Sequence, residues 1–93
     1  MKHRANPRFW SFYDQLEPEI RQLADKNFKL LLRDPHHPSL RFKRVGRFWS
    51  ARVGLNHRAV ATRRDDDFVW FWIGSHAEYD RLLADPAIDH PGT

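Results

Sequence analysis

The sequence predicts a single-domain α+β protein in which an N-terminal helical hairpin packs on an antiparallel sheet of three to four strands. Apolar residues recur at helical spacing in the first third of the chain, and from Leu40 onward their period changes to two. The 93 residues, of which 41% are hydrophobic, suffice for one modest core and leave no room for a second domain. We therefore expect one domain over residues 1–84.

The first two elements are predicted to be helices separated by a proline break. Asn6 offers an N-cap side chain and Pro7 suits the first helical position, so a helix from Pro7 to about Leu16 is expected. Pro18 disfavours helical geometry in the residue before it and then suits the start of a second helix, which is predicted to end near Arg33. The first third of the chain is thus a helical hairpin.

The middle of the chain is predicted to form three half-exposed strands after a proline-containing loop at residues 34–38. Apolar and polar side chains alternate over Leu40–Val53, with Gly46 at the turn between the first two strands. A turn at residues 54–56 leads to a third strand around Arg58–Thr62. These segments form an antiparallel meander.

A central strand and a short C-terminal helix complete the predicted domain. Phe68–Ile73 is apolar on both faces, which is typical of a strand covered on two sides, and a charged turn at Arg63–Asp67 precedes it. Gly74 is expected to end this strand, and Ala77–Leu83 has the pattern of a short helix. Residues 85–93 are expected to form a flexible tail.

Composition indicates a cytoplasmic protein. The chain contains no cysteine, which excludes a disulfide framework and fits a reducing compartment. No segment approaches the roughly 20 apolar residues of a membrane span, and the N-terminus lacks the apolar run of a signal peptide. The formal net charge of +4 favours an anionic partner but does not by itself distinguish nucleic acid from other polyanions.

The strongest functional signal is a basic segment in the middle of the chain. Residues 35–64 carry eight Lys and Arg side chains and no carboxylate, which leaves a positive field uncompensated. Because the helical hairpin covers one face of the strands, the other face is the expected location of a basic group. Its members are Arg41, Lys43, Arg52 and Arg58. Side chains on adjacent strands can converge on one phosphate, although each residue taken alone could equally be a solvated strand residue.

His76 follows the predicted central strand closely, where a side chain can overlook the open face of the sheet. RNA can be cleaved without a metal if one group accepts the 2′-hydroxyl proton, another protonates the leaving 5′-oxygen, and cations stabilise the pentavalent phosphate. Histidine suits either proton role near neutral pH, whereas arginine only stabilises charge. Taken alone, His76 would be structural or solvent-facing; beside arginines it is a candidate acid or base.

Other polar and aromatic groups have simpler interpretations, and we expect no metal and no cofactor. His36 and His37 are adjacent loop histidines, which make a weak ligand set, and the three aspartates at residues 65–67 are typical of a solvated turn. No glycine-rich phosphate loop or nucleophile motif is present. The alternation of the interleaved aromatics predicts core positions, with base stacking as the alternative. They are Phe42, Phe48 and Trp49.

Four short motifs occur in order over most of the chain. They are Asp34-Pro-x-x-Pro-Ser-Leu, Trp49-Ser-Ala-Arg-Val, Asn56-His-Arg-Ala and Ile73-Gly-Ser-His-Ala-Glu-Tyr-Asp-Arg-Leu-Leu83. Together with the element order they resemble the RelE/ParE superfamily of bacterial toxins from toxin–antitoxin pairs, from about Asn6 to Leu83. The resemblance implies a RelE-like fold with a short first strand near Lys2–Ala5. It also implies a microbial cytoplasmic protein neutralised by an antitoxin.

The same resemblance implies specific site residues. RelE-type members cut messenger RNA in the ribosomal A site with basic residues on the sheet, and a YafQ-like branch has a histidine just after the last strand. His76 matches that histidine, Arg58 matches the arginine at the start of the third meander strand, and Arg52 matches a basic position of the preceding strand. These three are the catalytic candidates. Candidate RNA-binding residues are Arg41, Lys43, Arg44, Arg47 and His57.

The resulting hypothesis is a toxin that acts as a metal-independent, ribosome-dependent mRNA endoribonuclease. Its expected partners are a cognate antitoxin, mRNA and the ribosome, with a weak homodimer as a further option and no membrane. Two alternatives remain open at this point. One is ParE-like inhibition of DNA gyrase without RNA catalysis, and the other is a non-toxic binding module with the same fold.

Overall fold

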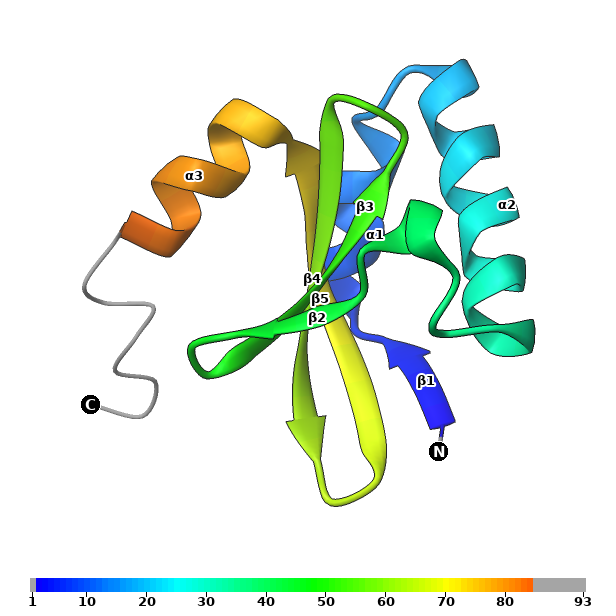
Figure 1. The fold of residues 1–93 in the computed structure, drawn as a ribbon. Helices are drawn as coiled ribbons and strands as arrows, with labels where there is room; N and C mark the ends of the chain where they lie inside the picture. The colour runs from blue at the N-terminus through cyan, green and yellow to red at the C-terminus, as the bar shows by residue number, and fades with distance from the viewer. Residues whose placement is uncertain (1, 85–93) are drawn as a thin grey trace.

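The computed structural model describes residues 2–84, which form three α-helices around a five-stranded sheet (Figure 1). The elements are β1 (Lys2–Ala5), α1 (Pro7–Asp14), α2 (Pro18–Arg33), a 3₁₀ helix (Pro38–Leu40), β2 (Lys43–Val45), β3 (Phe48–Val53), β4 (His57–Arg64), β5 (Asp67–Ser75) and α3 (His76–Ala84). The strand order is β1-β5-β4-β3-β2. The predicted α+β fold, with a helical hairpin on a sheet and a short C-terminal helix, is confirmed.

The sheet combines the predicted antiparallel meander with one parallel strand. Strands β2 to β5 pair antiparallel in sequence order, while β1 pairs parallel to β5, with Ala5 opposite Trp70. This first strand is the one that the resemblance implied near Lys2–Ala5, and it raises the number of strands to five. The side-chain pattern of four residues is too short to identify a strand. Strand β1 is recognised only by its parallel pairing with β5.

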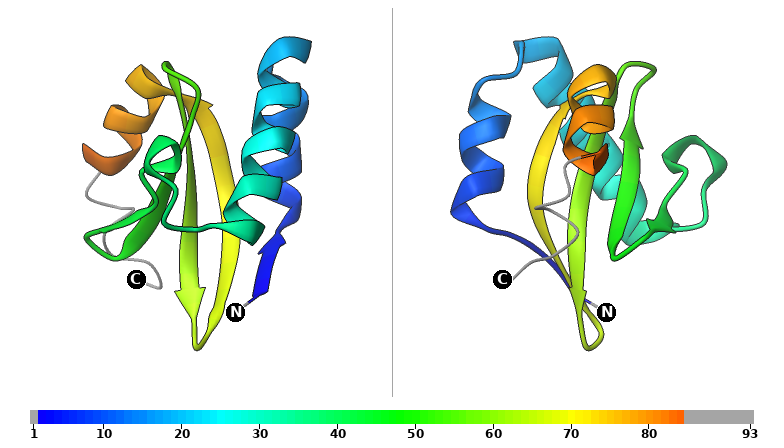
Figure 2. Two further views of the ribbon diagram at one scale, coloured as in Figure 1. Left: turned by 45° about the vertical axis from the view of Figure 1, so that its right-hand side comes forward. Right: turned by 90° about the vertical axis from the view of Figure 1, so that its left-hand side faces the viewer.

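The sheet separates two apolar layers (Figure 2). The α1–α2 hairpin covers one face and α3 covers part of the other, as the left panel of Figure 2 shows. The core on the hairpin side contains nine buried residues: Leu31, Leu40, Ala51, Val53, Ala59, Ala61, Phe68, Trp70 and Ile73. The smaller core under α3 contains Phe48, Val60, Trp72 and Tyr79.

The two N-terminal helices begin at the predicted prolines. Asn6 caps α1, since its Oδ1 accepts a hydrogen bond from the Phe9 backbone N–H at 3.0 Å. Helix α1 ends at Asp14, two residues before the predicted Leu16. The reason is that Leu16 N–H bonds to the carbonyl three residues back, at 3.0 Å, which tightens and closes the last turn. Helix α2 ends at Arg33, as predicted.

Strand β2 begins at Lys43, later than the alternation from Leu40 predicted. His37 caps a 3₁₀ helix in this segment, because its Nδ1 accepts a hydrogen bond from the Ser39 backbone N–H at 3.2 Å. Arg41 then adopts a left-handed conformation with φ of 43°, which redirects the chain. Leu40 consequently points into the hairpin-side core as a fully buried residue instead of lying in a strand.

Strands β4 and β5 are longer than predicted, and the turn between them is shorter. Strand β4 continues to Arg64, and β5 begins at Asp67, which pairs with Arg64 and lies 3.6 Å from the Arg4 guanidinium. Asp65, with φ of 55°, makes the left-handed turn that allows this short connection. Asp65 and Asp66 therefore form the exposed turn that was expected. Asp67 instead is the first residue of β5.

Strand β5 is covered on both faces, as its apolar sequence predicted. Trp70 packs on the hairpin side and Trp72 packs on the α3 side, because a bulge opposite Val60 and Ala61 leaves Phe71 outside the pairing. The strand includes Gly74 and Ser75, one residue beyond the glycine expected to end it, and α3 begins at once with His76. The predicted helix at Ala77–Leu83 is thus confirmed with one extra residue at each end.

The interleaved aromatics are core residues, as the alternation predicted. Phe48 is buried under α3, while Phe42 and Trp49 pack on the hairpin-side core with ring centroids 5.1 Å apart. Among residues 2–84, no helix is long and apolar enough to cross a membrane. The predicted tail at residues 85–93 lies outside the described residues.

Candidate active site on the α3 side of the sheet

Two arginines face each other across the β3–β4 ladder. Arg52 and Arg58 are direct cross-strand partners, and Arg58 is in turn paired with Gly74 of β5. Their neighbours Val53 and Ala59 are buried in the hairpin-side core, so alternation places both arginines on the opposite face, which α3 partly covers. Cβ atoms of direct partners in an antiparallel ladder lie about 4.5–5.5 Å apart. The sheet therefore brings together the two arginines that the sequence assigned to a phosphate site.

The field at this pair is positive. Burial is the main cause that lowers the pKa of Arg58, the charges of Arg52 and Arg41 lower it further, and Tyr79 and Asp80 act in the opposite direction. The Arg52 Nε donates to the Gly54 carbonyl at 2.9 Å, and one Arg58 Nη donates to the His57 carbonyl at 2.9 Å. Each side chain is thus anchored by one N–H to nearby backbone, while a bound anion would relieve the mutual repulsion of the guanidinium groups.

The other predicted basic residues divide between the two faces. Lys43 pairs with Ser50, which lies two residues from Arg52 on the same strand, so the register places Lys43 on the arginine face. Arg44 pairs instead with Trp49, whose ring packs on the hairpin-side core, and its Nε donates to the Gly46 carbonyl at 3.0 Å. Arg47 lies in the turn between β2 and β3. The structure groups Arg41 and Lys43 with the arginine pair, but not Arg44.

His57 occupies a different row from the arginine pair. It lies opposite Val53 on one side and Ser75 on the other, one residue out of step with Arg58. Its charge contributes to the lowered pKa of Glu78, for which hydrogen bonds from Ser75 are the main cause. His57 therefore lies in β4 opposite Ser75, the residue that precedes α3, and not in the row of Arg52 and Arg58.

His76 is the first residue of α3 and begins the helix directly after β5. Its backbone N–H donates to the Asn56 carbonyl at 2.7 Å, and its Nδ1 lies 3.1 Å from Asp80 Oδ2. The imidazole is about half exposed, at 48% of its side-chain surface, and the Tyr79 ring meets it edge-on at 6.1 Å. Tyr79 and Asp80, which contact the His76 ring, both act electrostatically on Arg58, so these two contacts of His76 lie on the arginine side of the sheet.

A capping box that the sequence analysis missed holds the start of α3. Ser75 Oγ accepts from the Glu78 backbone N–H at 3.1 Å, while Glu78 Oε1 accepts from the Ser75 backbone N–H at 3.1 Å and from its hydroxyl at 2.8 Å. These bonds lower the pKa of Glu78. The signal was present in the sequence as a serine followed three residues later by glutamate. Its consequence is a fixed first turn on which His76 sits.

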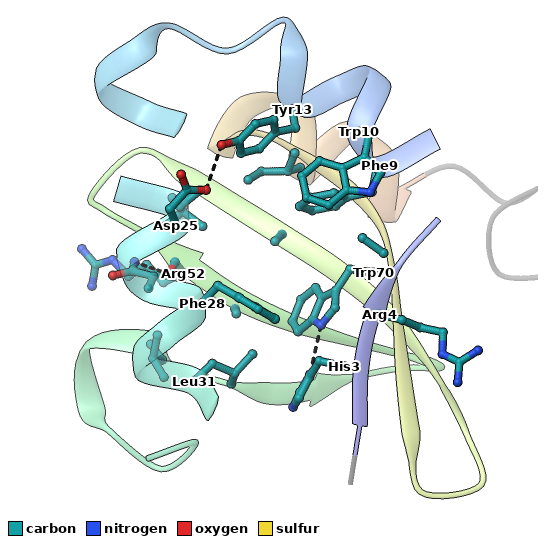
Figure 3. A pocket seen from close by; sticks show the side chains of 18 residues that line it. His3, Arg4, Phe9, Trp10, Tyr13, Asp25, Phe28, Leu31, Arg52 and Trp70 are labelled. Atoms are coloured by element: carbon teal, nitrogen blue, oxygen red, sulfur yellow. Dashed lines mark hydrogen bonds between the residues drawn. The ribbon is translucent and has the colours of Figure 1, made fainter. Parts of the chain in front are cut away.

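The opposite face of the sheet carries an apolar pocket of about 240 Å³ between α1, α2 and the strands (Figure 3). The Tyr13 hydroxyl donates to Asp25 Oδ1 at 2.8 Å across the two helices, and Trp70 Nε1 donates to His3 Nδ1 at 3.1 Å deeper inside. Trp10 and Phe28 line the pocket and remain 50% and 43% exposed. Among residues 2–84, no group of three or more His, Asp or Glu side chains is arranged to hold a metal ion.

Comparison with known proteins relates the fold to one group of solved structures. No model of a known protein family matches the chain, and no curated protein matches its sequence. The structure is similar to YafQ from Escherichia coli, with a TM-score of 0.66, 10% sequence identity, and 83% of this chain and 94% of YafQ covered. It is also similar to a chain of the RelB–RelE antitoxin–toxin complex from Methanococcus jannaschii, with a TM-score of 0.65, 14% identity, and 84% and 96% coverage.

A third similar structure is the YoeB/ParE toxin from Agrobacterium tumefaciens, with a TM-score of 0.61, 15% identity, and 82% and 99% coverage. Two of these three structures are named as toxins, one of them in complex with its antitoxin, and all three share the α+β fold of this chain. The fold of this chain is therefore the RelE/ParE toxin fold. That finding confirms the fold that the sequence resemblance implied.

Proposed function

We propose that this chain is the toxin of a toxin–antitoxin pair and cleaves messenger RNA on the ribosome without a metal ion. The observation that carries this proposal is the direct cross-strand pairing of Arg52 with Arg58 on the face that α3 and His76 border. The toxin function is further supported by the neighbours of the same fold, whose names are those of toxins.

The chemistry assigns a different task to each side chain. The guanidinium groups of Arg52 and Arg58 bind the scissile phosphate and stabilise the charge that builds up on its oxygens in the pentavalent transition state. His76 carries one of the two proton transfers, either accepting the 2′-hydroxyl proton or protonating the leaving 5′-oxygen, and water carries the other. No electrons are exchanged, so the scheme needs no redox cofactor, and the two guanidinium groups supply the positive charge at the phosphate.

The electrostatics of the arginine pair support a phosphate ligand. Burial and the neighbouring arginines lower the pKa of Arg58, which means that its surroundings disfavour its positive charge. A phosphodiester placed between the two guanidinium groups supplies the missing negative charge and accepts bidentate hydrogen bonds. Lys43 extends the same positive surface along the sheet and fits the path of an RNA backbone.

An antitoxin partner is the second part of the proposal. The RelE fold is known in complex with RelB in the Methanococcus jannaschii structure. In this chain, the apolar pocket and the exposed rings of Trp10 and Phe28 form an apolar surface of the kind that protein partners cover. A basic toxin also favours an acidic, amphipathic partner segment. A cytoplasmic location follows from this proposed role on ribosomes.

The direct test expresses the chain and its variants under tight control and follows growth together with primer extension on a reporter mRNA in a translating extract. We expect growth arrest and discrete cleavage with the unaltered chain, and loss of both for Arg58→Ala and His76→Ala. Arg64→Ala is the matched control, because Arg64 is exposed at the far end of the same strand β4. Cleavage by both Arg58→Ala and His76→Ala at the unaltered rate would overturn the assignment.

Gyrase inhibition is the competing function, since one structural neighbour carries the name ParE. A supercoiling assay with purified gyrase separates the two functions, because an endoribonuclease leaves supercoiling unchanged. Inhibition of supercoiling without mRNA cleavage would favour this alternative. Normal growth on overexpression, with neither effect, would instead indicate a binding module that has kept the fold.

A further inference from the structure

His76 and Asp80 form a contact within one turn of α3. The Nδ1 atom of His76 lies 3.1 Å from Oδ2 of Asp80, four residues later, where helical geometry places two side chains on the same side. The Ser75–Glu78 capping box fixes the first turn, so His76 presents its ring from a defined position. Glu78, the other carboxylate beside His76, is already engaged by Ser75. Asp80 is therefore the carboxylate that accepts a hydrogen bond from the imidazole.

This contact determines which ring nitrogen carries the proton. A carboxylate only accepts hydrogen bonds, so the neutral imidazole must place its proton on Nδ1 in order to donate to Asp80. The opposite nitrogen, Nε2, is then left with its lone pair. In water a free neutral histidine prefers the other arrangement, with the proton on Nε2. Asp80 thus selects the less common tautomer.

The surroundings of the pair confine the ring from a second side. Tyr79 is almost fully buried against Trp72, at 9% exposure, and its ring meets the His76 ring edge-on. On the same face of the sheet, Tyr79 and Asp80 both act to raise the pKa of Arg58 of β4, which burial lowers. The His76 ring consequently lies between a buried aromatic ring and a carboxylate on its Nδ1.

We propose that Asp80 is a positioning residue, which holds His76 in the Nδ1–H tautomer and leaves Nε2 as the atom that exchanges a proton with RNA. The catalytic half of this inference rests on the proposed ribonuclease function, whereas the tautomer does not. Asp80 itself touches no substrate in this scheme. The proton that His76 gains or loses passes through Nε2, while the hydrogen bond from Nδ1 to Asp80 is kept.

A purely structural role for Asp80 would make its replacement lower the stability of the fold, whereas a positioning role would not. His76 and Asp80 are 48% and 63% exposed, and exposed ion pairs contribute little to stability. Asp80→Ala should therefore leave the thermal unfolding midpoint almost unchanged. Its effects should appear in the state of the His76 ring and in the cleavage rate. Asp80→Asn keeps a carbonyl oxygen that accepts from Nδ1, so it should preserve the tautomer.

The tautomer is measured by two-bond ¹H–¹⁵N correlation spectra of ¹⁵N-histidine-labelled protein at pH 8, with the His76 signals assigned from their loss in His76→Gln. We expect a protonated Nδ1 and an unprotonated Nε2 in the unaltered chain and in Asp80→Asn, and a shift toward protonated Nε2 in Asp80→Ala. A protonated Nε2 in the unaltered chain, or no change in Asp80→Ala, would overturn the proposal. Neither readout depends on RNA cleavage.

The cleavage arm then tests the role in the reaction. We expect Asp80→Ala to slow cleavage about tenfold, a part of the 10²–10⁴-fold that an acid–base group typically contributes, and Asp80→Asn to restore most of the rate. Asp66→Ala is the matched control, since Asp66 is an exposed aspartate in an i,i+3 pair with Arg63. In a His76→Ala background, Asp80→Ala should have no further effect. Full activity of Asp80→Ala alone would contradict positioning.

The two proposals fail in different ways. If His76→Ala cleaves as fast as the unaltered chain, the proposed catalytic role of His76 fails, and the spectra still decide whether Asp80 sets its tautomer. If His76→Ala is inactive and Asp80→Ala is fully active, the ribonuclease function stands and the positioning role of Asp80 is wrong.

Discussion

Arg52 and Arg58 lie directly opposite each other on the adjacent strands β3 and β4. Like charges at such positions destabilise a sheet, and partial burial adds to the cost, as the lowered pKa of Arg58 reflects. Nothing in the local packing requires two arginines here, because their chain neighbours already supply the buried contacts of both strands. The arrangement supports the proposed phosphate ligand, since an anion between the two guanidinium groups would convert the repulsion into binding energy.

Replacing one member of the pair should separate activity from stability. We expect Arg58→Gln to abolish mRNA cleavage while leaving the free energy of unfolding unchanged or raising it by up to about 1 kcal/mol, since it removes a like-charge cross-strand pair. Urea denaturation followed by tryptophan fluorescence measures the second quantity. The matched control is Arg64→Gln in the same strand. A large loss of stability for Arg58→Gln alone would indicate a structural arginine.

The register of β2 distinguishes two adjacent basic residues. Lys43 pairs with Ser50 on the arginine face, whereas Arg44 pairs with Trp49 on the hairpin side. We therefore expect Lys43→Ala to weaken binding of a short RNA and to reduce the salt dependence by about one counterion, and Arg44→Ala to have the smaller effect. Fluorescence anisotropy over a range of salt concentrations measures both. A larger effect of Arg44→Ala would place the RNA on another surface.

His3 should make stability depend on pH in the weakly acidic range. Burial, with a further contribution from the positive N-terminus, lowers the pKa of His3 from 6.5. Its neutral Nδ1 accepts the Trp70 Nε1–H, and its ring stacks on Phe68 with centroids 5.1 Å apart. Because the folded pKa is below the unfolded one, this contribution is present above pH 6.5 and is lost as the pH falls below it.

The variant His3→Gln keeps a hydrogen-bond acceptor for Trp70 but does not titrate. We expect its unfolding midpoint in urea to depend less on pH just below 6.5 than that of the unaltered chain. His36→Gln serves as a control in an exposed loop. Identical pH profiles for His3→Gln and the unaltered chain would exclude His3 as the responsible group.

The capping box of α3 predicts a second pH dependence at more acidic values. Hydrogen bonds from Ser75 lower the pKa of Glu78 from 4.5, so the carboxylate stabilises the fold above that value and this contribution is lost as the pH falls through the lowered pKa. Ser75→Ala removes the cap and should cost about 0.5–2 kcal/mol at neutral pH. Hydrogen exchange at α3 amides, compared with those of α2, shows whether the loss is local.

Gly74 should resist substitution for a steric reason. A Cβ there would lie 2.6 Å from Trp72 Cζ2, closer than a real side chain allows, and 3.3 Å from Glu78 Oε1. We expect Gly74→Ala to destabilise the protein by about 1–3 kcal/mol, because Trp72 must move within the core under α3. Thermal unfolding tests this value. Gly46→Asn is the comparison, since that glycine has a left-handed φ but no neighbour within 4 Å.

The local elements were predictable because their signals lie close together in the chain. Asn6 and Pro7 mark the start of α1, and Pro18 marks that of α2, since these side chains act on their own backbone within one turn. The prediction that β2 begins at Leu40 was wrong, because Arg41 adopts a left-handed backbone conformation and β2 begins only at Lys43. The candidate site was predicted in part. Arg52 and Arg58 meet as expected, but Arg44 and His57 fall in other rows.

The helical hairpin and the alternating strands were predictable from the sequence, because side-chain periods of 3.6 and 2 follow from backbone geometry alone, and the carboxylate-free basic segment is read directly from the residues. Only the folded chain shows that Arg52 faces Arg58, that β1 joins β5 in parallel, and that His76 contacts Asp80 on α3. Register and docking depend on contacts between residues far apart in the chain, and a shift of one residue would move every arginine to the other face.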